Sequence, residues 1–235
     1  MKIQPAIKET IVIPWEEIDR AKVPGQKENI ILRKRGEEFS IRIAGTELMN
    51  SRLHGSEDAL AKLTCNCIKT KSNPKILIGG LGMGYTLAAA LEQLNPDAHI
   101  IVAELIPAVV KWNQEHLGHL AGNPLEDNRV AVEKVDVAKI IRQRKSAWDA
   151  ILLDVDNGPE GLTRKANDFL YNRTGLKTSF LALRPGGILS IWSSKEDEAF
   201  TKRLQQCGFQ TKIQTVRARK TGKGARHIIW LAEKF

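Results

Sequence analysis

Residues 75–92 read Lys75-Ile-Leu-Ile-Gly-Gly-Leu-Gly-Met-Gly84-Tyr-Thr-Leu-Ala-Ala-Ala-Leu-Glu92, and this stretch decides the fold. The apolar run predicts a buried strand, the spaced glycines predict a tight loop, and the alanine- and leucine-rich run predicts a helix. Gly80, Gly82 and Gly84 let the backbone turn sharply and approach a ligand, and the helix start offers free N–H groups. This strand–loop–helix unit is typical of an α/β protein that binds a nucleotide-like molecule.

A second predicted strand adds an acid at an informative distance. It runs from His99 to Ala103 and is followed by Glu104, placed to accept hydrogen bonds from a ribose diol. The dinucleotide pattern G-x-G-x-x-G needs a glycine where Tyr85 stands. The actual spacing, G-x-G-x-G, resembles the S-adenosylmethionine (SAM) binding loop of class I methyltransferase-like folds. The alternative is a strand–helix turn whose glycines serve packing alone.

The composition is that of a soluble globular protein, with 235 residues of which 42% are hydrophobic. No apolar run approaches the roughly 20 residues that a bilayer span needs, and the first residues lack the apolar segment of a secretion signal. Cys65, Cys67 and Cys207 make neither a disulfide framework nor a four-ligand metal site, and His116 and His119 lack an evident third ligand. We therefore expect a cytoplasmic protein with no membrane association and no metal.

The net charge of +9 is concentrated near the end of the chain. Residues 199–232 contain no acid, and their basic residues are Lys202, Arg203, Lys212, Arg217, Arg219, Lys220, Lys223 and Arg226. Such a block can attract an anionic substrate, a phosphate or RNA. Basic residues also guard exposed strands against aggregation, and aromatic residues for base stacking are nearly absent here, so nucleic-acid binding is not favoured.

The hydrophobic pattern changes at residue 54. Residues 1–53 are predicted to form a small N-terminal β-hairpin unit, whose hairpin turns at Gly36 between strands 29–34 and 38–43. Residues 54–235 are predicted to form a SAM-type nucleoside-binding α/β domain, which begins with a connecting helix in 54–74. Further short strands are expected at 10–13 and 45–49.

Strands and helices alternate after residue 75. This alternation predicts an α/β, Rossmann-like, mostly parallel seven-stranded sheet with helices on both faces, closed by an antiparallel hairpin. The predicted strands are 75–79, 99–103, 129–132, 150–153, 188–192, 209–216 and 226–232. At the helix ends, Ser56 is expected as one N-cap, Pro107 and Gly118 as the limits of one helix, and Ser193 with Glu196 as a capping box.

Acids follow three consecutive predicted strands. Besides Glu104 they are Asp136, within reach of an adenine amino group, and the pair Asp154 and Asp156. Ligands of open α/β sheets bind outside the carboxyl ends of the strands, so we expect these acids to share one site. For any single acid, a helix cap is the simpler interpretation. The segment 155–172 is predicted to gate the site, and Asp154 or Asp156 to orient an acceptor or remove its proton.

Two further residues, His54 and Glu57, lie where the connecting helix starts, near the same edge of the sheet. They are either substrate contacts or simply the start of a helix, and the second interpretation is favoured.

The glycine loop, these acids, Asp154-Val-Asp-Asn-Gly-Pro159 and Leu183-Arg-Pro-Gly-Gly-Ile188 resemble the spermidine synthase family. The resemblance is good over 75–192 and covers most of the chain. It implies a methyltransferase-like domain behind a small N-terminal β domain, transfer of an aminopropyl group from decarboxylated SAM to a polyamine, and a homodimer. The nucleoside-binding residues that it implies are Gly80, Gly82, Gly84, Glu104, Asp136 and Asp154.

The polyamine half of the pattern is not matched. The family carries an amine-binding aspartate where this chain has Gly82, and its catalytic aspartate falls at Asn157, one residue after Asp156. An amide neither removes a proton nor pairs with an ammonium as a carboxylate does. A strongly basic chain is also an unexpected partner for a polycation.

Three functions follow from these observations. The favoured one is methyl transfer from SAM to an unidentified small acceptor, possibly anionic, with Asp154, Asp156 and Asn157 as the catalytic residues. The first alternative is aminopropyl transfer from decarboxylated SAM to a polyamine. The second is a non-catalytic protein that binds RNA or another polyanion through residues 199–232.

Overall fold

The computed structural model describes residues 13–155, 168–219 and 224–235. The chain divides into two compact units, residues 1–50 and 51–235, so the boundary lies after Asn50 rather than after Leu53. None of the helices in the described ranges is both long and apolar enough to cross a membrane.

The first unit is a four-stranded antiparallel sheet with the strand order β1-β2-β3-β4. Its strands are β1 (Glu16–Lys22), β2 (Asn29–Arg35), β3 (Glu38–Ile43) and β4 (Thr46–Asn50). The predicted hairpin around Gly36 is confirmed as β2 and β3. Strand β1 was not predicted, because its sequence EEIDRAK carries charges at most positions, as edge strands do. Apart from Ile13, the strand expected at 10–13 lies outside the described residues.

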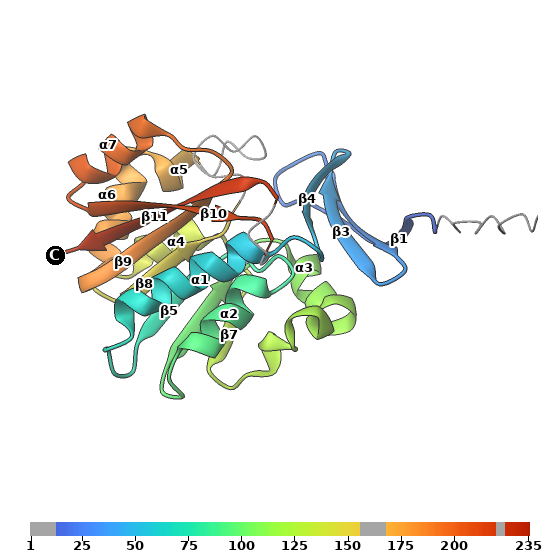
Figure 1. Cartoon of the computed structure of the whole chain (residues 1–235), viewed down its shortest axis with the longest axis horizontal. Coiled ribbons are helices and arrows are strands. Elements are labelled where there is room, and N and C mark those ends of the chain that lie inside the picture. The colour runs from blue at the N-terminus through green and yellow to red at the C-terminus, as the bar shows by residue number, and fades with distance from the viewer. Residues whose placement is uncertain (1–12, 156–167, 220–223) are drawn as a thin grey trace, which may run out of the picture. The chain divides into compact units, whose positions relative to one another are not determined.

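The second unit contains a seven-stranded sheet in the order β10-β11-β9-β8-β5-β6-β7. The strands are β5 (Lys75–Gly79), β6 (His99–Ala103), β7 (Val130–Glu133), β8 (Trp148–Leu153), β9 (Leu183–Ser193), β10 (Gln210–Arg217) and β11 (Arg226–Lys234). The five neighbouring strands β9, β8, β5, β6 and β7 run parallel to one another. Strand β11 pairs antiparallel with β9, and β10 pairs antiparallel with β11 at that edge of the sheet. The predicted α/β fold class is therefore confirmed (Figure 1).

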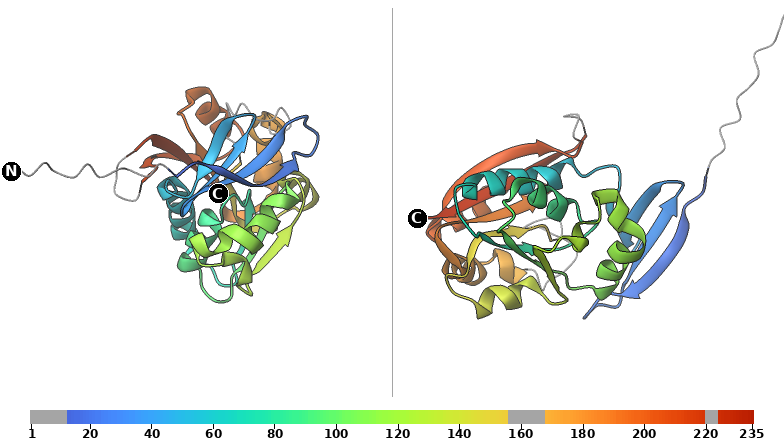
Figure 2. Two further views of the ribbon diagram at one scale, coloured as in Figure 1. Left: turned by 90° about the vertical axis from the view of Figure 1, so that its right-hand side faces the viewer. Right: turned by 90° about the horizontal axis from the view of Figure 1, so that it is seen from below.

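Helices cover both faces of this sheet. They are α1 (Gly55–Ile68), α2 (Tyr85–Gln93), α3 (Pro107–Trp112), α4 (Val137–Gln143), α5 (Asp168–Tyr171), α6 (Arg173–Ala182) and α7 (Glu198–Gln206). The long helix α1 packs beside α2 and against strands β8 to β11, whereas α4, α6 and α7 cover the opposite face (Figure 2).

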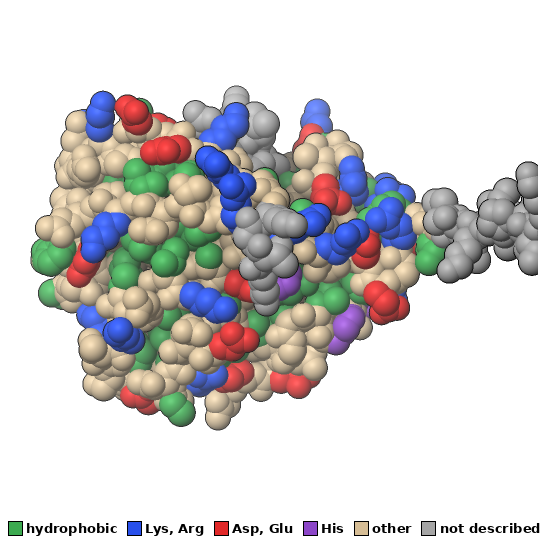
Figure 3. Space-filling view, in the orientation of Figure 1, with side chains coloured by type: hydrophobic (Ala, Val, Ile, Leu, Met, Phe, Trp, Pro, Cys, Tyr) green, Lys and Arg blue, Asp and Glu red, His purple; other side chains and the backbone are tan. Residues whose placement is uncertain are grey.

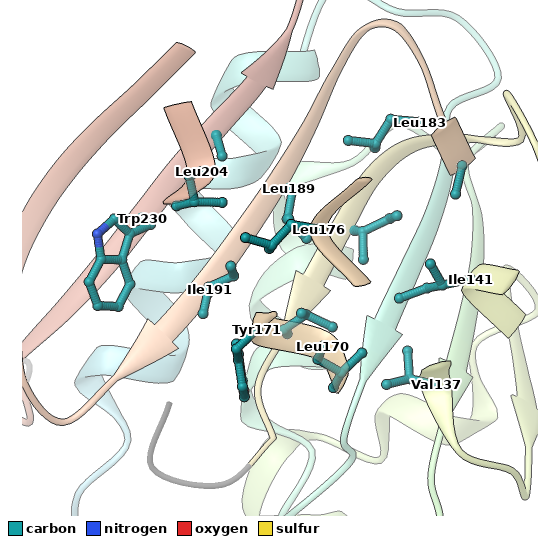
Figure 4. Close-up of a cluster of buried hydrophobic side chains, with 14 of the residues drawn as sticks. Val137, Ile141, Leu170, Tyr171, Leu176, Leu183, Leu189, Ile191, Leu204 and Trp230 are labelled. Atoms are coloured by element: carbon teal, nitrogen blue, oxygen red, sulfur yellow. The ribbon is translucent and has the colours of Figure 1, made fainter. Parts of the chain in front are cut away.

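Strands β5 and β8 are buried at nearly every position, which explains their continuous apolar sequences. The apolar side chains of β8, β9 and β11 meet those of α4, α6 and α7 in a cluster that includes Leu189, Ile191 and Trp230 (Figure 4). Val137 and Tyr171 lie in the same cluster, and the Tyr171 hydroxyl donates to the Val155 carbonyl at 3.1 Å. The cluster thus helps to hold the backbone at Val155, just after the end of β8.

Three helix ends differ from the sequence prediction. The N-cap of α1 is His54, so Ser56 lies inside the first turn. Helix α7 is capped by Asp197, whose side chain accepts from the Phe200 N–H, so the capping box at Ser193 and Glu196 is wrong. In both cases the N-cap is the polar residue directly before the helix, and its backbone lies outside the helical conformation.

The helix expected from Pro107 to Gly118 ends as an α-helix at Trp112. It continues as a π-helical turn, η1 (Asn113–Leu117), and a 3₁₀ turn, η2 (Gly118–Ala121). Short π-helical segments are frequent at functional sites. Here the segment begins at Asn113.

Candidate functional site

The glycine loop joins β5 to α2 with a backbone that requires glycine. Gly80, Gly82 and Gly84 have φ angles of 90°, 53° and 84°. A Cβ on Gly80 would also lie 2.4 Å from the Asp154 carbonyl oxygen. The loop therefore brings β5 and β8 close together at the point where the strand order reverses, which is the usual ligand position in such sheets.

Glu104 holds the glycine loop against the end of β6. One carboxylate oxygen accepts from the Leu81 N–H at 2.9 Å, and the other accepts from the Ile106 N–H at 2.8 Å. The residue is only 7% exposed. Burial raises the pKa of Glu104, and the backbone N–H groups act in the opposite direction. The acid lies at the strand end that its sequence position indicates.

Asn113 holds the loop from the other side, and the sequence analysis missed it. Its Nδ2 donates to the carbonyls of Gly82 at 2.8 Å and Val109 at 2.9 Å. It is 4% exposed, although amides are seldom fully buried. An asparagine directly after Trp112 in an apolar helical stripe was the available signal, but its contact with Gly82 depends on the π-helical turn.

Asp136 lies after β7 and caps α4, since its Oδ1 accepts from the Ala138 N–H at 2.8 Å. The cap interpretation weighed for this acid is therefore realised, and only part of the carboxylate is used by it. Asp156 and Asn157, together with the expected gating segment as far as residue 167, lie outside the described residues.

Asp154 ends β8 beside the glycine loop. Its N–H donates to the Gly79 carbonyl at 2.9 Å, and its Oδ2 accepts from the Thr86 hydroxyl at 2.6 Å. Burial raises the pKa of Asp154, against the effect of the Thr86 hydrogen bond. Asp154 is half-buried, and with one hydroxyl donor its carboxylate is poorly compensated when ionised.

Glu57 is a second half-buried acid, and the charge of Asp154 acts on it. It lies in the first turn of α1 and accepts from the Ser56 hydroxyl at 2.6 Å. Burial, and then the negative charge of Asp154, raise the pKa of Glu57 to about 7. Burial raises the pKa of both carboxyl groups, and the charge of Asp154 adds to the shift of Glu57, so a cation beside them would favour their ionised forms. A structural role was the favoured expectation for Glu57, and its electrostatic coupling to Asp154 adds a chemical one.

An aromatic and imidazole cluster adjoins this pair. The rings of His54 and Tyr85 stack with centroids 4.0 Å apart and planes 11° from parallel. His54 Nδ1 lies 3.2 Å from Asp58 Oδ1, and the Tyr85 hydroxyl donates to the Ser51 carbonyl at 3.1 Å. Burial, with the charges of Glu57 and Asp58, raises the pKa of Tyr85 to about 12, so the phenol stays neutral.

The described basic residues of 199–232 lie on α7, β10 and β11, except Arg219, which follows β10, and β10 is an edge strand of the sheet. Lys220 and Lys223 lie outside the described residues. On the face drawn in Figure 3, Lys and Arg side chains of the second unit are interspersed with Asp and Glu. The Ala218 carbonyl accepts from the Gly55 N–H at 2.8 Å, which ties the end of β10 to the start of α1.

Among the residues that the structure describes, no group of three or more His, Cys, Asp or Glu side chains is arranged to hold a metal ion. His116 contacts Glu115 at 3.8 Å on an exposed surface.

The chain is similar to known proteins over most of its length. A family model, the spermine/spermidine synthase domain, matches residues 58–221. A polyamine aminopropyltransferase of Clostridium tetani (strain Massachusetts / E88) is 31% identical over 86 residues, which are 36% of this chain but only 30% of that relative. The match thus spans less than a third of the curated relative.

Solved structures extend the likeness to the fold. The crystal structure of spermidine synthase from Thermotoga maritima matches with a TM-score of 0.73 and 18% identity, over 93% of this chain and 73% of the other. A spermidine synthase in complex with the transition-state analogue AdoDATO matches with a TM-score of 0.71 and 17% identity, over 93% and 72%. At such identities the likeness establishes the fold alone.

Proposed function

The chain belongs to the spermine/spermidine synthase family, and from this premise we propose that it transfers an aminopropyl group from decarboxylated SAM to an amine acceptor of the polyamine class. The sequence favoured methyl transfer over aminopropyl transfer, and the proposal now puts aminopropyl transfer first. Methyl transfer finds no support among the relatives, whereas the curated relative is a polyamine aminopropyltransferase.

The observation that carries the proposal is the pairing of Glu57 with Asp154. An amine acceptor is a cation at neutral pH and needs a carboxylate environment, which Gly82 and Asn157 do not supply. An ammonium beside two half-buried acids whose pKa values are raised favours their ionised forms and offsets part of the cost of their burial. The local charge is therefore negative although the chain as a whole is basic.

The donor's nucleoside fits the backbone-built half of the site. Gly80 and Gly82 leave the loop without side chains at positive φ, and Glu104 stands beside the loop at the end of β6. We assign Glu104 to the ribose, Asp136 to the adenine amino group, and the glycine loop to the remainder of the donor, with Asp154 at the border between donor and acceptor. The donor supplies a carbon bound to a positively charged sulfur, and the chain's residues orient the acceptor nitrogen toward it.

A product assay tests this proposal. The purified protein is incubated with SAM or decarboxylated SAM and a set of diamines, and mass spectrometry follows the nucleoside product. Aminopropyl transfer releases 5'-methylthioadenosine, whereas methyl transfer releases S-adenosylhomocysteine. Turnover with SAM alone, giving a methylated acceptor, would restore the order expected from the sequence.

Turnover of an amine should also depend on the paired acids. Glu57→Gln keeps the shape of the side chain and removes its charge, so we expect the KM for the amine to rise about tenfold, which corresponds to about 1.4 kcal/mol. Glu92→Gln, on the exposed part of α2, is the matched control. A homodimer and a cytoplasmic location remain predictions, and gel filtration tests the first.

A further inference from the structure

We infer that His54 is the general base that removes the proton from the acceptor ammonium, an inference that rests on the proposed amine transfer. Transfer to an amine requires such a group, because a protonated nitrogen has no free electron pair. The position where the family places its catalytic acid holds Asn157, which cannot accept a proton at neutral pH.

The orientation of the His54 ring is fixed on two sides. Asp58 Oδ1 lies 3.2 Å from Nδ1, one helical turn away along α1, and the ring stacks on Tyr85 at 4.0 Å. A carboxylate at Nδ1 favours the tautomer that carries its proton there, and this leaves the Nε2 electron pair available. Among the residues that the structure describes, none donates a hydrogen bond to Nε2.

The ring also lies at the edge of the paired acids. Tyr85 directly follows Gly84, so stacking holds the imidazole next to the glycine loop. The charge of His54 is close enough to act on Glu57, which in turn is close to Asp154. Glu57 and Asp154 would hold the ammonium by charge, and His54 would take its proton.

The groups that contact or act on His54 come from α1 and α2. Asp58 and Tyr85 contact the ring, and Glu57 is close enough to feel its charge. Glu57 is in turn affected by Asp154, and the exposed Arg217 and Arg219 flank Ala218, whose carbonyl accepts from the Gly55 N–H. The charged groups that act directly on the ring are therefore acids. The imidazolium that forms on proton transfer is therefore stabilised by adjacent negative charge.

The step balances without a further reactant. Nε2 accepts one proton from the acceptor ammonium, and the freed nitrogen pair forms a bond to the methylene carbon attached to the donor sulfur. The carbon–sulfur bond breaks, and its electron pair leaves with the sulfur as a neutral thioether. The proton stays on His54 beside Asp58 and is then released to water.

Kinetics distinguish a base from a structural residue. We expect His54→Gln to lower kcat by about 10²-fold or more with the KM for the amine changed less than about threefold, because general bases contribute 10²–10⁴-fold. The wild-type kcat should fall as pH falls through the protonation of the base, and this limb should vanish in the variant. Added imidazole should restore part of the rate. Asp58→Asn should lower kcat by about tenfold while leaving the ring in place.

His99→Gln is the matched control, since His99 is exposed at the start of β6, at the opposite end of that strand from Glu104. Equal kcat values and equal pH profiles for wild type and His54→Gln would overturn the inference while leaving amine transfer intact. Absence of turnover in the wild type would instead count against the proposed function.

The tautomer can be measured without turnover. The chain has 5 histidines, so ¹⁵N-labelled histidine and the His54→Gln variant identify the ring signals of His54. We expect Nδ1 to carry the proton and Nε2 to be unprotonated at pH 8, and Nε2 to be the nitrogen that gains a proton on acidification. A proton on Nε2 with bare Nδ1 at pH 8 would overturn the inference in the free protein.

Discussion

The proposed nucleoside-binding and acceptor-binding halves of the site are built from different kinds of groups. The proposed nucleoside half is a backbone loop with three glycines at positive φ, held by a glutamate that accepts backbone N–H groups and an asparagine that donates to backbone carbonyls. The acceptor half consists of side chains that meet from the first turns of α1 and α2 and from the end of β8. Substitutions in the first half should thus act on folding and nucleoside affinity together, and those in the second on amine chemistry.

The strongest test of this contrast is Gly80→Ala. The new Cβ would meet the Asp154 carbonyl at 2.4 Å, and alanine is strained at a φ of 90°. We expect the free energy of unfolding to fall by about 3 kcal/mol and nucleoside binding to be lost. Gly122→Ala is the control, because Gly122 also has positive φ but nothing lies within 4 Å of its Cβ position. Urea unfolding and calorimetry with 5'-methylthioadenosine measure both effects, and equal losses in the two variants would contradict the close-contact argument.

Asn113→Ala tests how far the shape of the glycine loop depends on a hydrogen bond from outside the loop. It removes two hydrogen bonds and leaves the half-buried Gly82 carbonyl without this donor, whereas the Val109 carbonyl still accepts from the backbone N–H of residue 113. We expect a loss of about 2 kcal/mol in unfolding free energy and weaker nucleoside binding, with amine binding changed less. Gln114→Ala, at the adjacent exposed position, should have little effect. Unchanged nucleoside affinity in Asn113→Ala would mean that the loop holds its shape alone.

Glu57→Gln should act in the opposite direction on stability. The pKa of Glu57 is raised from 4.5 to about 7, so the folded chain holds this proton more tightly than the unfolded chain. The charged carboxylate therefore destabilises the fold increasingly as pH rises from about 4.5 to above 7. We expect the variant to be more stable than wild type by about 1–2 kcal/mol at pH 8, and this advantage to vanish near pH 4. Urea titrations at the two pH values check this, and a variant less stable than wild type at pH 8 would contradict it.

The smallest effect is expected at the basic residues. Neutralising the exposed Arg217 and Arg219 should change unfolding free energy by less than about 0.5 kcal/mol and leave both ligand affinities unchanged. RNA binding that weakens steeply with salt and disappears in this double variant would support the polyanion-binding alternative instead. Filter binding at two salt concentrations distinguishes the outcomes.

The same contrast explains what the sequence predicted. The glycine loop and Glu104 lie within one β–α–β segment, where residue spacing determines geometry, so their positions at the strand ends followed directly. The approach of Glu57 to Asp154 depends on how α1 packs beside α2, and segments so distant in sequence carry no spacing signal. Asn113 depends on a π-helical turn that no helical periodicity indicates. The misplaced caps at Ser56 and Ser193 reflect the direction from which the chain enters each helix.

The electrostatic repulsion between the Glu57 and Asp154 carboxylates also bears on the lifetime of the protein. If the proposed amine binds between them, the empty protein is the less stable form, and ligand that binds only the folded chain shifts the folding equilibrium toward it. Proteases cleave the opened chain, so a cell poor in the amine would degrade this protein faster. The acid pair would then couple the abundance of the protein to its own substrate supply, with no separate regulatory site.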